Sequence, residues 1–156
     1  MKSLIIVYSY HHLNTQKIGE AIARVLGAEI KMPQNTEPTQ LDSYDLVGFG
    51  AGIDSGKHYK ELLDFADKLP NSDGKKAFIF STSGISNPDY RAKIHTALRG
   101  KLQAKGYVIV DEFNCHGHDT NSFLKLFGGI NKGRPNNEDL AAAEEFAQKL
   151  MQSSQP

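Results

Sequence analysis

The sequence predicts an α/β protein built on a doubly wound parallel β-sheet. Four apolar runs, at residues 4–8, 46–49, 77–80 and 107–110, are nearly continuous rather than alternating. Such runs are typical of strands covered on both faces, as in parallel sheets. Apolar stripes with helical spacing separate most of the runs, and strand–helix alternation with short connections predicts a right-handed, doubly wound sheet.

The first strand is predicted at residues 4–8, and a weaker run at residues 28–32 alternates between apolar and charged side chains. This alternation is typical of an edge strand with one exposed face. No helical stripe separates it from the next run. The expected order of elements is therefore β-α-β-β-α-β-α-β-α, with the helix between the second and third strands missing or reduced.

The helices are predicted from apolar residues spaced three and four positions apart, which form one buried face. Asn14 or Thr15 is the expected N-cap of the first helix. Pro70 ends the second, and the last helix carries Glu138 and Asp139 in its first turn, where acids complement the helix dipole. The four stripes cover residues 18–26, 59–69, 94–102 and 140–150.

Length and composition limit the function classes. The 156 residues fit a single domain, residues 1–156. No stretch approaches the roughly 20 apolar residues of a membrane span, and the first apolar run is too short for a secretory signal. We therefore expect a cytoplasmic protein with no membrane partner. Its 18 basic residues balance 18 acidic ones, so nucleic acid is not an expected partner.

The single cysteine, Cys115, excludes an intrachain disulfide and a cysteine-based zinc site. We expect it to be a small buried hydrophobe. Two short histidine pairs, His11 with His12 and His116 with His118, lack an accompanying carboxylate-rich ligand set, so no metal site is predicted.

Ligands of doubly wound sheets bind beyond the carboxyl ends of the strands. After the first strand, a polar loop runs directly into a helix, where backbone N–H groups and the positive end of the helix dipole form a phosphate site. Its side chains add hydroxyl, amide and imidazole donors, so no lysine is required. Neither the Walker A motif nor Gly-x-Gly-x-x-Gly is present here. The candidate residues are Ser9, Tyr10, His11, His12, Leu13, Asn14 and Thr15.

Three more segments follow strand ends. A glycine-rich segment follows the run at residues 46–49, and its glycines allow positive φ and close approach to a flat ring. A loop of small residues follows the run at residues 77–80. The last strand, which extends toward Cys115 if residues 112–115 prolong it, leads into a connection up to residue 136 that is either functional or a structural wrap. The candidates are Gly50, Ala51, Gly52, Ile53, Asp54, Ser55, Gly56, Thr82, Ser83, Gly84, Ile85, His116 and Gly117.

These motifs resemble the flavodoxin family over essentially the whole chain. Ser9, His12, Asn14 and Thr15 match in order the family's phosphate loop, Ser/Thr-x-(Thr/His)-Gly-Asn-Thr. The glycine-rich segment is similar to the loop beside one face of the flavin, and Thr82-Ser83-Gly84 stands in the place of the loop at its other edge. Cys115-His116-Gly117 together with Asn131-Lys132-Gly133-Arg134-Pro135 is similar to a branch of short flavodoxin-like proteins of bacteria and archaea.

The resemblance implies a five-stranded sheet with strand order 2-1-3-4-5 and FMN as cofactor, held by the candidate residues named above. It implies an electron carrier rather than a catalyst, with no catalytic residues of its own, that exchanges electrons with redox partner proteins as a monomer or weak dimer. The chain departs from the family in being neutral rather than acidic. Ile53, Tyr90 or His116 would then cover the flavin ring, because no tryptophan is present.

Two alternatives remain open. One is an FMN-dependent NAD(P)H quinone or flavin reductase, which needs a second open pocket. The other is a flavodoxin-fold binding module that has lost its flavin, because Leu13 stands where the family usually has glycine. A response-regulator receiver is excluded by the lack of acids after the first strand. A low-molecular-weight phosphatase is excluded because no cysteine lies in the first loop.

Overall fold

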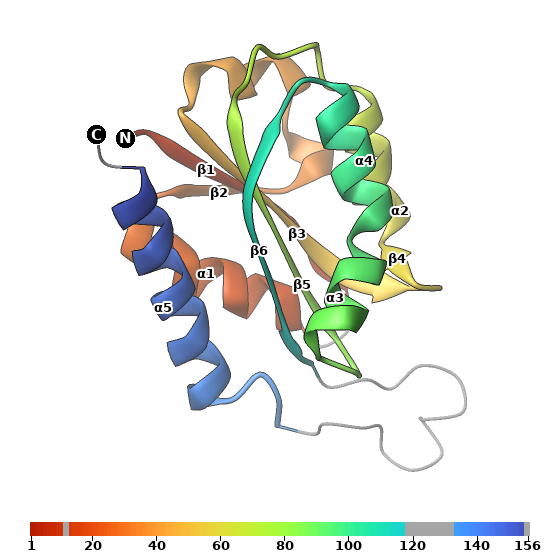
Figure 1. Ribbon diagram of the computed structural model, residues 1–156, viewed down its shortest axis with the longest axis vertical. Coiled ribbons are helices and arrows are strands. Elements are labelled where there is room, and N and C mark those ends of the chain that lie inside the picture. Colours follow the sequence, from red (N-terminus) through yellow and green to blue (C-terminus); the bar gives the residue numbers. More distant parts are fainter. Residues whose placement is uncertain (11–12, 118–132, 155–156) are drawn as a thin grey trace.

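A computed structural model describes residues 1–10, 13–117 and 133–154 of the chain. Figure 1 shows a twisted central sheet with helices on both faces, and the two termini lie close together. None of the helices in these three ranges is both long and apolar enough to cross a membrane. The elements in chain order are β1 (Ser3–Tyr8), α1 (Asn14–Leu26), β2 (Glu29–Lys31), the 3-10 helices η1 (Pro33–Asn35) and η2 (Pro38–Ser43), β3 (Leu46–Asp54), β4 (Lys57–His58), α2 (Lys60–Asp67), β5 (Lys76–Ser83), α3 (Pro88–Ile94), α4 (Thr96–Ala104), β6 (Val108–His116) and α5 (Asn137–Ser153).

The sheet has the order β2-β1-β3-β5-β6, and these five strands are parallel. The predicted doubly wound fold and the order 2-1-3-4-5 are therefore confirmed. A short sixth strand, β4, was not predicted; it pairs antiparallel with the end of β3. The two residues between them, Ser55 and Gly56, have φ of 54° and 80°, as the tightest hairpin turns require.

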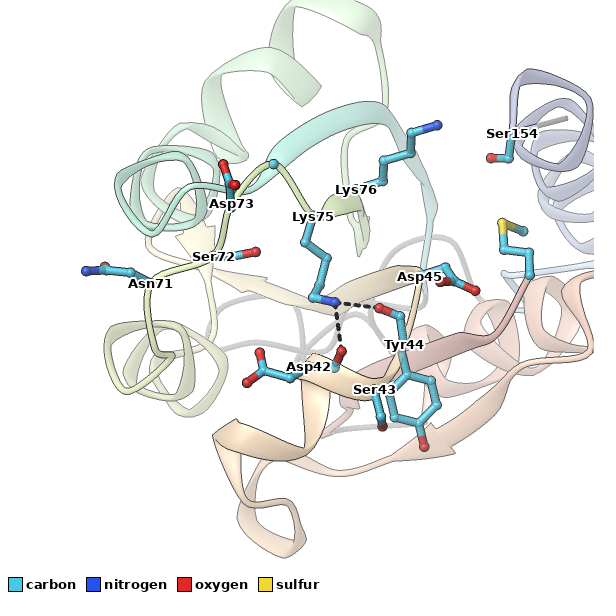
Figure 2. A pocket seen from close by; sticks show the side chains of 12 residues that line it. Asp42, Ser43, Tyr44, Asp45, Asn71, Ser72, Asp73, Lys75, Lys76 and Ser154 are labelled. Carbon is cyan, nitrogen blue, oxygen red and sulfur yellow. Dashed lines mark hydrogen bonds between the residues drawn. The ribbon is translucent and has the colours of Figure 1, made fainter. Parts of the chain in front are cut away.

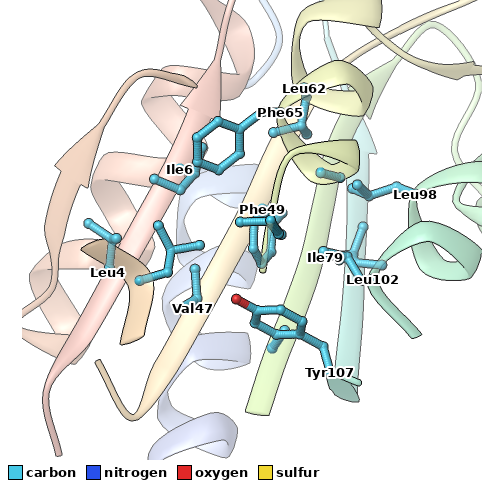
Figure 3. Packing of buried hydrophobic residues seen from close by; sticks show 14 of the residues in the cluster. Leu4, Ile6, Val47, Phe49, Leu62, Phe65, Ile79, Leu98, Leu102 and Tyr107 are labelled. Atoms are coloured by element: carbon cyan, nitrogen blue, oxygen red, sulfur yellow. The ribbon is translucent and has the colours of Figure 1, made fainter. Parts of the chain in front are cut away.

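The central strands are covered on both faces, which explains their continuous apolar runs. Side chains of β1 alternate between two clusters: Leu4 and Ile6 join the cluster under α2 and α4, and Ile5 and Val7 the cluster under α1 and α5. Figure 3 shows the first cluster, where Phe49 packs at the centre and the rings of Phe49 and Tyr107 meet edge to face. The prediction of two-sided burial is confirmed for β1, β3 and β5.

For β6 that prediction is wrong. Among the described residues this strand ends the sheet, with no strand beyond its outer edge, and Val108 is 51% exposed. A register shift opposite Ala77 and Phe78 interrupts its pairing with β5. β6 also continues to His116, so residues 112–115 do prolong the last strand, as the sequence analysis allowed. An apolar run of four residues cannot distinguish a central strand from an edge strand.

The helices differ from the predictions in two places. The stripe at residues 94–102 is divided between α3 and α4, which meet at the buried His95. Between β2 and β3 lie two short 3-10 helices. This confirms the prediction that the helix in this position is missing or reduced. At the start of α5, Asn136 and Asp139 form a reciprocal capping box, which satisfies two backbone N–H groups that a helix end leaves open.

Gly50 lies within β3 rather than in a loop, and packing explains why it is glycine. A Cβ atom at this position would lie 2.2 Å from the ring of Phe80 on the neighbouring strand. Phe80 is fully buried beneath α1 and α5, so it has no free space into which to move. Of the three glycines in the segment from Gly50 to Gly56, only Gly56 has the positive φ that the sequence analysis allowed for.

We therefore expect Gly50→Ala to lower the free energy of unfolding by about 1–3 kcal/mol through overpacking. Gly100→Ala is the matched control, because Gly100 lies inside α4 and nothing stands within 4 Å of its missing Cβ. That change should stabilise the protein by about 0.5–1 kcal/mol. Urea denaturation of both variants measures the difference, and equal effects would contradict the packing argument.

Candidate functional site

The carboxyl ends of β1, β3, β5 and β6 meet at one rim of the sheet, and α1 begins there. The closest link between these elements is a contact of two hydroxyl groups: the Oγ1 atoms of Thr15 on α1 and Thr82 on β5 lie 2.8 Å apart, and both residues are buried. Two predicted site residues 67 positions apart in sequence are thus brought together.

Leu13, not Asn14 or Thr15, is the N-cap of α1, so the predicted cap is wrong. Leu13 has φ 52° and ψ 33°, the left-handed conformation, and its side chain makes no capping hydrogen bond. For a residue other than glycine this conformation costs about 1–2 kcal/mol. The side chain is 52% exposed, which spares it a collision in the core. The first loop thus takes, with leucine, the backbone turn for which glycine is best suited.

The rest of the first loop closes around the start of α1. The backbone N–H of Gln16 donates to Ser9 Oγ at 3.4 Å. Asn14 is buried, and a Cβ at Gly117 would come within 2.8 Å of the Asn14 amide nitrogen. A side chain at Gly117 would therefore press on Asn14 and Thr82 where the end of β6 approaches α1. His11 and His12 lie outside the described residues, as does His118.

The second predicted segment, from Gly50 to Gly56, forms most of a β-hairpin rather than an irregular loop. Its residues from Gly50 to Asp54 continue β3, and only Ser55 and Gly56 form the turn. A Cβ at Gly52 would stand 2.7 Å from the ring of Tyr59. That ring in turn meets Tyr8 and Tyr10 edge to face, so an aromatic cluster ties the hairpin to the end of β1.

The third segment and the end of β6 are joined by polar contacts. Thr82 and Ser83 are the last residues of β5, and Gly84 and Ile85 follow it. The Ser83 hydroxyl donates to the carbonyl of Ile85 at 2.5 Å, and the Gly117 N–H donates to the Ser83 carbonyl at 3.0 Å. Two buried atoms nearby, Asn114 Oδ1 and His116 Nδ1, find no hydrogen-bond partner among the described residues.

A buried polar network that the sequence analysis missed lies just below this rim. His95 Nδ1 is 2.8 Å from a carboxylate oxygen of Glu112, and its Nε2 is 2.6 Å from Ser81 Oγ. Arg99 donates to both oxygens of Glu112, at 2.8 and 2.7 Å. His58 stacks at a tilt against His95, with ring centroids 4.9 Å apart. These residues come from β4, β5, α4 and β6 and from the junction of α3 and α4, so no local sequence pattern could predict the network.

Burial sets the protonation of the two imidazoles. Burial, together with a smaller effect of the neighbouring His95, lowers the pKa of His58 to about 3. The pKa of His95 is also lowered by burial, against the opposing effect of Glu112. Burial alone would raise the pKa of Glu112, but hydrogen bonds from His95 and Arg99 outweigh it and bring that pKa down to about 2. At neutral pH both imidazoles are therefore neutral and Glu112 is ionised.

Cys115 behaves as predicted. It is buried, and burial raises the pKa of its thiol to about 12, so it is an unreactive hydrophobe. No group of three or more histidine, cysteine or acidic residues within the described ranges is placed to hold a metal ion.

A hollow with a volume of about 680 Å³, shown in Figure 2, lies at the amino ends of the strands, opposite the rim described above. Its central cation, the ammonium group of Lys75, donates to the carbonyl oxygens of Asp42 and Tyr44 at 3.3 and 2.5 Å. Lys75 thus fastens the segment before β5 to the segment before β3. Because ligands of doubly wound sheets bind at the carboxyl ends, this hollow is not the candidate site.

Comparisons with known proteins agree with this geometry. The family model described as a flavodoxin domain matches residues 5–149. An uncharacterized protein of Methanocaldococcus jannaschii is 45% identical over 153 residues, which cover 98% of this chain and all of that protein. Oxidised flavodoxin 2 from Bacillus cereus aligns with a TM-score of 0.73 at 19% identity, covering 98% of this chain and 99% of its own. A short-chain flavodoxin associated with a bacterial microcompartment aligns at 0.71 with 16% identity, covering 99% and 100%.

The buried imidazoles make stability depend on pH. The pKa of His58 is about 3 in the folded protein and about 6.5 in the unfolded chain. The unfolded chain therefore binds more protons between these values, and the free energy of unfolding falls as the pH is lowered from 7. For His58 alone the loss at pH 5 is about 2 kcal/mol.

His58→Gln should remove this contribution, so that it loses about 2 kcal/mol less than the wild type between pH 7.5 and pH 5. Lys57→Gln, on the exposed neighbouring residue, is the control and should follow the wild type. Chemical denaturation at both pH values provides the measurement. Parallel losses in all three proteins would show that His58 is not held neutral by burial.

Proposed function

The chain belongs to the flavodoxin family, and on that premise we propose that it binds FMN at the carboxyl rim of the sheet and transfers electrons between partner proteins. The single observation that carries this proposal is the start of α1, where buried hydroxyl and amide side chains surround a helix N-terminus. Bound FMN would supply one- and two-electron redox chemistry, and the protein would position it and exclude water from it.

The residues at the start of α1 fit a phosphate group. A helix of 13 residues directs its first backbone N–H groups and the positive end of its dipole at this point. The hydroxyl groups of Thr15 and Thr82 share one hydrogen bond, which uses one of their two protons and leaves the other to donate to an anion. Ser9 and Asn14 would complete a set of neutral donors that holds a phosphate monoester without a lysine.

The hairpin of β3 and β4 and the turn after Ser83 fit the two sides of a flat ring. Both flank the start of α1 at the same rim, and Gly52 and Gly117 leave room where a side chain would collide with Tyr59 or Asn14. Asn114 Oδ1 and His116 Nδ1, which lack partners among the described residues, would accept or relay hydrogen bonds close to the polar edge of the ring.

Exposed apolar side chains surround this rim. Tyr10, Leu13 and Ile85 are each more than half exposed, while the net formal charge of the chain is zero. Encounters with redox partner proteins would then be driven by apolar contact around the flavin, with little electrostatic steering and weak dependence on salt. We propose that the protein works as a monomer or weak dimer.

The conformation of Leu13 weighs against a module that has lost its flavin. That alternative depended on a backbone turn that leucine would not adopt, and the turn is present at φ 52°.

Titration with FMN tests the proposal directly, because flavin fluorescence is quenched on binding. Failure of the folded protein to quench FMN at micromolar concentration would contradict it. Hydride transfer directly from NADPH to the bound flavin would instead identify a reductase.

A substitution at the start of α1 tests the phosphate assignment. Thr15→Ala should weaken FMN binding about 10- to 100-fold, the effect of losing a hydrogen bond of about 1.5–3 kcal/mol to a charged group. Binding of riboflavin, which has no phosphate, should change much less. Thr96→Ala removes an exposed hydroxyl that donates to the carbonyl of Ala92, and it serves as the control. Equal losses for FMN and riboflavin would contradict the assignment.

A further inference from the structure

The imidazole of His58 is not explained by packing alone. The residue is 1% exposed, and its Nε2 lies 3.1 Å from the carbonyl oxygen of Phe80, to which it must donate. Its Nδ1 is buried with no partner among the described residues. An unpaired buried acceptor is unfavourable, and an apolar ring at this position would carry no such acceptor. The hydrogen bond to β5 is what the imidazole adds.

This hydrogen bond fixes the hairpin. His58 pairs with Ile53 across the two strands, so the turn of Ser55 and Gly56 projects beyond it toward the rim. Among the described residues, the hairpin has no other side-chain hydrogen bond to β5. The backbone ladder already ties β3 to β5 as far as Gly52 and Thr82, and the bond from His58 to the carbonyl of Phe80 ties the outer strand of the hairpin, β4, to β5 as well.

The turn after β5 is fixed from the same place. His95 faces the Glu112 carboxylate through Nδ1, which therefore carries the proton, and Nε2 accepts the Ser81 hydroxyl at 2.6 Å. Asn114 donates to the oxygens of Ser81 and Ser83, at 2.8 and 3.1 Å. Ser83 then donates to the carbonyl of Ile85. The hydrogen bonds run without interruption from His95 to the turn after Ser83.

The contact between the two imidazoles joins these anchors. Their ring centroids are 4.9 Å apart, and His95 is held against the sheet at the junction of α3 and α4 with no exposed surface. A displacement of either ring therefore meets the other, because close-packed interiors transmit strain. Arg99 and Glu112 support the pair from the outer side.

We propose that His58 and His95 form a single positioning unit that holds the hairpin of β3 and β4 and the turn after Ser83 at a fixed separation. The second half of this proposal rests on the proposed function, in which the two segments are the two walls of the flavin site. The unit then sets the affinity for the isoalloxazine ring and the preference for its oxidised or reduced form. His58 and His95 act through the two segments and do not touch the ring.

Hydrogen exchange in the flavin-free protein tests the unit without any ligand. His58→Phe, changed on the hairpin side, should speed amide exchange at Gly84 and Ser86 about tenfold, and Asn114→Ala, changed on the other side, should do the same at Asp54 and Lys57. His58→Gln retains an N–H donor for the Phe80 carbonyl and should restore exchange to within about twofold of the wild type. If each variant loosens only its own segment, the two anchors are independent and the proposal is wrong.

Leu102→Ala separates this effect from a general loss of stability. Leu102 is fully buried at the far end of α4, and its truncation destabilises the core without touching either imidazole. Leu102→Ala should raise the amide exchange rates at the two segments by the same factor as the rates in α1. If Leu102→Ala raised exchange at the two segments, relative to α1, as much as His58→Phe does, the proposal would be overturned. Glu112→Gln, which keeps an acceptor for His95 without the charge, provides a milder variant if His58→Phe does not fold.

Flavin binding tests the second half of the proposal. His58→Phe should weaken FMN and riboflavin by the same factor, about tenfold, which distinguishes the ring from the phosphate. It should also change the ratio of the dissociation constants of oxidised and reduced FMN at least threefold, and His58→Gln should restore that ratio. An unchanged ratio would contradict the link to the ring. If the wild type bound no flavin, the proposed function would fail while the exchange experiment still decided the positioning unit.

Discussion

Burial of β1, β3 and β5 on both faces is the constraint on which the rest of this structure depends. Strands enclosed by α1 and α5 on one side and by α2 and α4 on the other have no exposed face on which to carry polar chemistry. Polar groups that have to meet a ligand are therefore confined to the strand ends. The start of α1 lies at the carboxyl ends, and its dipole makes that rim the one suited to an anion.

A buried hydrogen-bonded network lies at the boundary between the apolar interior and the rim. Ser81 and His95 are fully buried, yet each belongs to a hydrogen-bonded chain that reaches the partly exposed Glu112 and Arg99. Such a network is favourable only when its members are satisfied together, which makes it rigid. A rigid layer under two short segments is a physical means of holding a flat ligand between them, because preorganised walls spend little of the binding free energy on ordering.

The sequence was informative where one local pattern has one physical cause. The continuous run of Leu4 to Val7 predicted a strand buried on both faces, and the polar loop before Thr15 predicted the start of a helix at the rim. It was not informative where the cause lies in another element. Gly50 is glycine because of Phe80 on the next strand, and His95 belongs with Glu112 and Ser81 only after three elements have packed. Leu13 is a different case, since its left-handed conformation could not be expected from leucine.

The central claim is that the start of α1 holds the phosphate of FMN through neutral donors. A crystal structure of the protein grown with FMN tests it most directly. We expect phosphate oxygens within hydrogen-bonding distance of the backbone N–H groups in the first turn of α1 and of the hydroxyl of Thr15 or Thr82, with no lysine in contact. A phosphate bound elsewhere, or side chains filling this rim while the flavin lies at another surface, would contradict it.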